Sequence, residues 1–288
     1  MPSILSKPLT LIAFAMCSLV AFQASGQVKQ GSEIGVWGGS AYYFGDINTS
    51  GAHLESMREG AGIFYRWNFH KRWALRTGLN YGHLQGADSL SSLPFQQRRN
   101  LSFRNRVFDL SSTMEFNFFE RKRNRYGQYK YFTPYIYVGI AFVYHQPQAF
   151  INDSWVDLRP LGTEGQAVPE FTGRDPYSTV TIAVPIGGGV KYFASKHFAI
   201  GLDFGFRKVF SDYIDDVSTT YVDPSVLAAN DNGNLAIALA DRSVEIDGQQ
   251  LGRPGSQRGD SARRDAYLYS GITLSYVFAE FWCPSPRN

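Results

Sequence analysis

The stretch RWALRTGLNYGHL, residues 72–84, carries its large side chains at every second position. Successive side chains of a β-strand point to opposite faces of the strand. One face of this segment would therefore be bulky and mostly apolar, with Trp73, Leu75, Thr77, Leu79 and Tyr81. The other face would hold only small, polar or charged side chains. An amphipathic helix spaces its apolar residues three and four apart, so the pattern predicts a strand.

The same alternation recurs along the chain, for example in FAIGLDFGF at 198–206. The expected strands cover 33–44, 59–69, 72–84, 105–118, 131–144, 178–193, 196–209 and 266–279. Eight is the smallest even number of strands that closes a transmembrane barrel, and about 9–11 residues suffice to cross a bilayer at a tilt. The fold class predicted is therefore all-β, an eight-stranded antiparallel up-and-down transmembrane β-barrel.

The connections between these strands alternate in length. Two are very short, FHKR at 69–72 and ASKH at 194–197, and the long ones are 45–58, 85–104, 145–177 and 210–265. Outer-membrane barrels place short turns in the periplasm and long loops outside the cell. This pattern predicts an outer-membrane protein with both termini periplasmic.

A soluble lipocalin-like barrel is the alternative, because periodicity alone does not say which face points outward. Aromatic side chains make up 15% of the chain and gather at the strand ends, as at Trp67, Trp73 and Tyr192. Membrane barrels carry such aromatic girdles at both interfaces, which favours the membrane.

The first 26 residues are typical of a secretory signal peptide. Lys7 precedes the apolar run LTLIAFAMCSLVAF, and the small residues Ala24 and Gly26 predict cleavage before Gln27. The barrel would occupy 27–288, with a periplasmic tail at 280–288. Cys17 leaves with the signal peptide, so Cys283 remains alone and a disulfide-stapled fold is excluded. A formal net charge of +3 gives no indication of nucleic-acid binding.

Several charged side chains fall on the face expected to line the lumen. An eight-stranded barrel is only wide enough for side chains to fill it, so we expect these charges to pair inside a plugged barrel rather than line a conducting pore. They are Arg66, Arg72, Arg76, Asp109, Glu115, Lys191, Asp203 and Arg207.

The histidines give no sign of an enzyme. A hydrolase needs a histidine close to a nucleophile and an orienting carboxylate. Only His83 is expected near a rim serine, Ser112, and nothing marks that pair as a site. We therefore expect neither catalysis nor a cofactor.

The segment FSDYIDDVSTTYVD contains the weak calcium candidates Asp212, Asp215, Asp216 and Asp223. Their spacing is not that of an EF-hand, so a helical turn capped by Ser211 or Asp212 is the favoured interpretation. The following stretch, 224–265, is predicted to be helix-like around VLAAN and LAIALADR. Its Gly- and Arg-rich end is predicted to be mobile.

Two features at the expected periplasmic end suggest partner binding. The connection ERKRNRYGQYK, 120–130, is basic through Arg121, Lys122, Arg123, Arg125 and Lys130. It is either a solvated turn near anionic lipid headgroups or a docking surface for an acidic protein. Cys283 lies in a tail with Pro284 and Pro286, and an unpaired cysteine in an exported chain suggests an intermolecular disulfide.

Three segments resemble the PorG family of small outer-membrane barrels from the Bacteroidota. They are EIGVWGGSAYYFGDINTS at 33–50, GIFYRWNFHKRWALRTGLNYG at 62–82 and FSDYIDDVSTTYVDP at 210–224. The resemblance implies a non-enzymatic component of the type IX secretion system, beside a periplasmic ring of the PorK lipoprotein and PorN. The ring lipoprotein would then be the partner of Cys283. The alternative is a surface-binding barrel that presents its long loops to a ligand or host.

Overall fold

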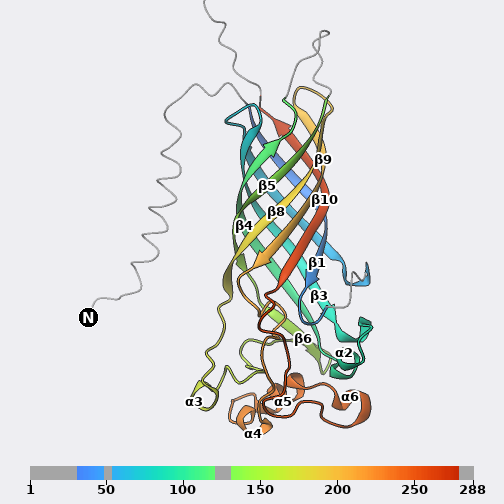
Figure 1. The fold of residues 1–288 in the computed structure, drawn as a ribbon, viewed down its shortest axis with the longest axis vertical. Helices are drawn as coiled ribbons and strands as arrows, with labels where there is room; N and C mark the ends of the chain where they lie inside the picture. Colours follow the sequence, from blue (N-terminus) through green and yellow to red (C-terminus); the bar gives the residue numbers. More distant parts are fainter. Residues whose placement is uncertain (1–30, 49–53, 121–130, 279–288) are drawn as a thin grey trace, which may run out of the picture.

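The computed structural model describes residues 31–48, 54–120 and 131–278 of the chain. Eight long strands form the body of the molecule (Figure 1). They are β1 (Ser32–Phe44), β2 (Arg58–Trp67), β3 (Trp73–Ala87), β4 (Ser102–Asn117), β5 (Tyr131–Tyr144), β8 (Val180–Phe193), β9 (Phe198–Val209) and β10 (Ala266–Val277).

Each of these strands pairs antiparallel with both of its neighbours, and the sheet closes on itself. The order around the barrel is β3-β2-β1-β10-β9-β8-β5-β4, and β4 pairs again with β3. Closure satisfies every backbone ladder without leaving an edge, which a strand in lipid requires. The predicted fold class, an eight-stranded antiparallel β-barrel, is confirmed.

The alternation of side chains decides what each face contacts. On β9, Leu202 and Phe204 point outward and are 48% and 52% exposed, whereas Asp203 between them is buried, as are Ala199 and Arg207 on the same inward face. The outer surface is therefore an apolar belt, as a bilayer demands. Inside, Gly82 and Gly205 leave room for aromatic rings, because a Cβ there would lie 2.5 Å from Tyr269 and 2.3 Å from the Tyr137 hydroxyl.

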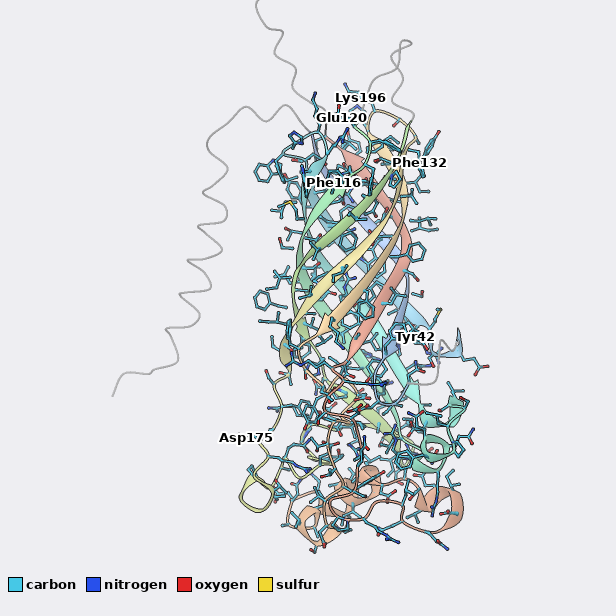
Figure 2. All side chains as sticks on the ribbon, in the orientation of Figure 1. Tyr42, Phe116, Glu120, Phe132, Asp175 and Lys196 are labelled. Atoms are coloured by element: carbon cyan, nitrogen blue, oxygen red, sulfur yellow. The ribbon has the colours of Figure 1, made fainter. Side chains whose placement is uncertain are left out.

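The two ends of the barrel differ. The short-turn end holds the turns 68–72 and 194–197. The start of β1 and the end of β10 also lie there, where Phe278 N donates to Ser32 O. The long-loop end holds the connections 45–57, 88–101, 145–179 and 210–265. Figure 2 shows Glu120, Phe132 and Lys196 at the short-turn end and Asp175 among the long loops at the opposite end.

The long connections contain regular structure that the strand pattern did not predict. The second holds η3 (Asp88–Leu90) and α2 (Pro94–Arg99), and the first holds η2 (Leu54–Ser56). The third forms a hairpin of β6 (Pro147–Ile151) and β7 (Ser154–Asp157), which pairs with β4, and then α3 (Pro169–Thr172). Both β3 and β4 run further toward the loops than expected because they pair with each other out to Ala87 and Ser102.

The fourth connection contains α4 (Pro224–Leu227), α5 (Gly233–Ala240) and α6 (Val244–Asp247). The helix-like stretches around VLAAN and LAIALADR are confirmed as α4 and α5. The helical turn expected at Ser211 or Asp212 is wrong, because no helix forms between 210 and 223. Asp223 caps α4 instead, accepting from Ser225 N at 2.8 Å.

The third and fourth connections share a small hydrophobic core. Leu158 and Leu161 from the third pack with Leu227, Ala236 and Leu239 from the fourth. We call the packed segments 88–101, 145–179 and 210–265 the loop cap. Among the described residues, no helix is both long and apolar enough to cross a membrane.

Candidate functional site

Ion pairs between strands, most of them not neighbours in the sheet, fill the lumen. Glu115 on β4 accepts from Arg66 Nε of β2 at 3.0 Å, and its other oxygen pairs with Lys191 of β8. Arg66 also pairs with Glu33 on β1. All four side chains are buried. Two acids and two bases thus form a neutral cluster near the short-turn end.

Two further ion pairs cross the barrel. Arg76 on β3 pairs with Asp203 on β9, and four steps around an eight-stranded ring make these strands diametrically opposite. The hydroxyls of Tyr135 and Tyr137 donate to the two oxygens of Asp203, at 2.6 and 2.9 Å. These side chains therefore plug the lumen of the barrel.

The second crossing pair lies nearer the loops. Arg207 Nε binds Asp109 Oδ2 at 3.0 Å, and the Tyr267 hydroxyl donates to the same oxygen at 3.1 Å. The expected pairing of lumen charges is confirmed for all but one of the predicted residues. Arg72 is the exception, since it lies in the turn before β3, where its side chain is 47% exposed and 3.7 Å from Glu120. Sequence reasoning missed Glu33, although it lies in phase with Trp37 on the inward face of the first expected strand.

The buried carboxylate of Glu164 links two segments of the loop cap, the third and the fourth long connections. This carboxylate accepts from the backbone N–H groups of Ser218 at 2.9 Å and Thr219 at 3.0 Å, and from the Thr219 hydroxyl at 2.6 Å. Arg258 Nη1 also binds it at 2.9 Å, and the Tyr213 hydroxyl donates to it at 3.4 Å. Glu164 therefore connects the third long connection to two separate parts of the fourth.

Two buried arginines extend this network. Arg258 also donates to the carbonyls of Ala240 and Asp216, at 3.1 and 2.7 Å. Arg99 binds both oxygens of Asp88, at 2.7 and 2.8 Å, and donates to Arg258 O at 2.6 Å. The prediction that the end of the fourth connection is mobile is thus wrong around Arg258, whose side chain is 2% exposed and held by these hydrogen bonds.

The four calcium candidates do not converge. Asp216 accepts from Thr163 Oγ1 at 2.5 Å and from the Tyr177 hydroxyl at 2.7 Å. Asp215 instead accepts from Ile47 N at 3.2 Å, and Asp223 caps α4 by accepting from Ser225 N. Within the part of the chain that the structure describes, no group of three or more His, Cys, Asp or Glu has metal-binding geometry. The weak calcium candidate is therefore not supported.

Burial changes the proton affinity of these acids. Burial raises the pKa of Asp216 to about 6, and it raises the pKa of Asp215 well above its usual value, with Asp265 adding to the effect. Burial likewise raises the pKa of Asp212 to about 7, and the neighbouring acids Asp46 and Glu164 add to the effect. At mildly acidic pH the loop cap therefore holds protons that the unfolded chain has already released, since an ordinary Asp carboxyl has a pKa of 3.8.

A pH dependence follows for Asp212. Its folded pKa of about 7 lies above the ordinary 3.8, so the folded cap binds the proton more tightly than the unfolded chain. The stabilising contribution is complete below about pH 4 and is lost as the pH rises through 7. We expect Asp212→Asn to slow proteolysis of 210–265 at pH 8 and to have no effect at pH 5.

The control for that measurement is Asp231→Asn, because Asp231 is an exposed carboxylate in the same connection. It should leave the proteolysis rate unchanged at both pH values. Equal rates for wild type and Asp212→Asn at pH 8 would contradict the prediction. Rates should be compared as ratios at each pH, since the protease itself responds to pH.

The structure places the histidine pair considered from sequence apart, as the strand register shows. His83 Nδ1 lies 3.0 Å from Glu59 Oε1, and in the β3–β4 ladder His83 faces Arg106 while Ser112 faces Thr77. The only rim pair considered from sequence, His83 and Ser112, is thus not brought together. His145 is fully buried against the Tyr177 ring, and burial lowers its pKa to about 4.

The residues predicted to bind a partner lie outside the described part of the chain. Arg121, Lys122, Arg123, Arg125 and Lys130 fall in 121–130, and Cys283 falls in 279–288. The segment 1–26, predicted to be a signal peptide, lies outside it as well. The flanking described residues, Glu120 and Phe278, are at the short-turn end.

A family model described as a domain of unknown function, DUF6089, matches residues 9–235. The chain belongs to this family. No curated protein matches it. The chain is similar in fold to the N-terminal β-barrel domain of Pseudomonas aeruginosa OprF, with 11% sequence identity and a TM-score of 0.37 over 86% of this chain and 100% of that one. It is also similar to Neisserial surface protein A, with 6% identity and a TM-score of 0.41 over 86% of this chain and 97% of that one. A third similar structure is Pseudomonas aeruginosa OprG, with 10% identity and a TM-score of 0.40 over 88% of this chain and 99% of that one.

Proposed function

We propose that this chain is a non-enzymatic outer-membrane component of the type IX protein secretion machinery, and that it docks a periplasmic ring complex to the outer membrane. The observation that carries the proposal is the filled lumen. Arg76 and Asp203 meet across the full width of the barrel, so paired side chains occupy the described lumen. The role of the barrel then rests on the surfaces at its two ends.

The proposed orientation puts the long-loop end outside the cell and both termini in the periplasm. Alternation of short turns and long loops supports it, because outer-membrane barrels export their long connections. The segment 121–130 then begins and ends on the periplasmic side, since it follows β4 and precedes β5 at the short-turn end.

The resemblance to the PorG family supplies the partners. The ring lipoprotein PorK and PorN are proposed to meet the basic side chains of 121–130, while outer-membrane lipid surrounds the barrel. Opposite charges across such an interface act mainly on the association rate and on the choice of partner.

Charge reversal tests this docking surface. Changing Arg121, Lys122, Arg123, Arg125 and Lys130 to Glu should reduce recovery of the ring proteins with the barrel by about 10-fold or more, as expected when like charges face each other. Recovery is measured by affinity purification from outer membranes followed by quantitative mass spectrometry.

A comparison variant reverses four charges at the long-loop end instead, with Arg98, Arg253, Arg263 and Arg264 changed to Glu, and it should keep full recovery. Heat-modifiable migration must show that both variants fold. Cys283 provides a second readout, because a disulfide to the ring lipoprotein gives a heavier band on non-reducing gels. That band should disappear with reductant and in Cys283→Ser; unchanged recovery together with a monomer-only pattern would contradict the docking proposal.

The alternative, a surface-binding barrel without a secretion role, has an observation in its favour. The loop cap exposes apolar side chains on two short helices that are linked by the Arg98–Asp247 ion pair. Phe95 on α2 and Ile246 on α6 are 49% and 56% exposed. Capture of a surface ligand that depends on these residues, with no ring proteins recovered, would favour this alternative.

A further inference from the structure

Two arginines interrupt the lipid-facing side of β4 at its long-loop end. The outward positions run Phe116, Met114, Ser112, Leu110 and Phe108 from the short-turn end, and then change to Arg106 and Arg104. Phe108, 46% exposed, packs against Tyr81 at 5.1 Å and faces Tyr144 on β5. Aromatic side chains of this kind mark the interface of a membrane barrel. The two guanidinium groups therefore lie at the level of lipid headgroups.

The hairpin β6–β7 holds one of these arginines in place. Arg104 pairs with Gln148 in the β4–β6 ladder, and its Nε donates to Gln148 Oε1 at 3.0 Å. The guanidinium lies 3.7 Å from the centre of the Trp155 ring. Trp155 is itself packed on Phe150 at 5.2 Å, and both rings are 42% exposed. Cation and aromatic surface are thus presented together in one orientation.

No carboxylate of the described residues forms an ion pair with Arg104 or Arg106. Glu59, on the same outer face, is bound to His83 instead. Arg104 and Arg106 occupy outward positions two residues apart on β4, so their like charges lie on the same face. Two like charges side by side on an outer face, with aromatic rings beside them, suit an anionic group that approaches from outside.

We propose that Arg104 and Arg106, with Trp155 holding the Arg104 guanidinium in place, bind the phosphate groups of a phosphorylated glycolipid of the lipid A type. Guanidinium groups bind phosphate through paired N–H donors. The acyl chains would lie along Phe108 and Leu110, which continue the same face of β4 into the apolar belt. This inference rests on the proposed orientation only for its location in the outer leaflet, not on the secretion role.

Binding is tested on the full-length mature protein, purified in detergent. Mixed micelles expose both ends of the barrel, so the result does not depend on orientation or on ring proteins. We expect bisphosphorylated lipid A to bind at least about 10-fold more tightly than dephosphorylated lipid A, since hydrogen bonds to charged groups are the strong ones. Phosphatidylglycerol micelles serve as the comparison for a general anionic surface.

Arg104→Gln combined with Arg106→Gln should remove the preference for the phosphorylated lipid. Arg72→Gln, an exposed arginine at the short-turn end, should retain it. Heat-modifiable migration verifies that each variant is folded. Equal binding of both lipid A forms, equal competition by phosphatidylglycerol, or equal loss in Arg72→Gln would overturn the proposal, whereas the ring-recovery experiment would be unaffected.

Discussion

Replacing Glu115 by glutamine should lower the free energy of unfolding by roughly 3–5 kcal/mol, the usual result of leaving a buried charge without its partner. Glu115 is the only group of the described lumen that pairs with both Arg66 and Lys191. Its loss changes a neutral set of two acids and two bases into a set with one excess positive charge. Single domains are stable by about 5–15 kcal/mol, so the effect is large. Urea unfolding of the barrel refolded in lipid vesicles, followed by tryptophan fluorescence, measures it.

Glu120→Gln is the matched control. It removes the partner of Arg72 in an exposed pair at the short-turn end, and such pairs contribute about 0–1 kcal/mol. Adding Lys191→Met to Glu115→Gln restores neutrality, because Arg66 keeps Glu33, and should recover part of the lost stability. Equal unfolding midpoints for Glu115→Gln and Glu120→Gln would contradict the proposed role of the lumen cluster.

The barrel could be predicted because one physical rule repeats in every strand. Each strand has a lipid side and a lumen side, so residues such as Phe204 and Asp203 reveal their faces by position alone. The narrow lumen also forces inward charges to meet, which is why Arg207 and Asp109 could be expected to pair although 98 positions separate them.

The loop cap could not be predicted, because its contacts follow no period. Glu164 and Arg258 are 94 positions apart, and neither lies in an amphipathic pattern. The aspartates of the calcium candidate are not brought together for a related reason. Asp216 has a φ of 65°, a left-handed conformation that turns the chain at this point, and Asp215 beside it is bound on the other side to Ile47 N. Neighbouring acids in sequence therefore do not imply a shared site.

Glu164→Ala should open the loop cap while leaving the barrel intact. The change removes the acceptor of four donors from Ser218, Thr219 and Arg258, and it leaves the Arg258 guanidinium buried without its carboxylate. Losing such contacts costs roughly 2–4 kcal/mol in local opening, which corresponds to proteolysis of 210–265 about 30-fold or more faster. Proteinase K digestion with mass-spectrometric mapping of the cleavage sites measures it.

Glu245→Gln is the control within the same connection, since Glu245 forms an exposed pair with Arg242 and should change the rate less than about twofold. Conductance in planar bilayers then tells whether the lumen ion pairs or the loop cap close the barrel. The lumen pairs Arg76–Asp203 and Arg207–Asp109 lie within the strands and do not involve Glu164. Glu164→Ala should therefore be cleaved readily and still conduct no more than wild type. A rise in conductance would mean that the loop cap, rather than the lumen network, closes this barrel.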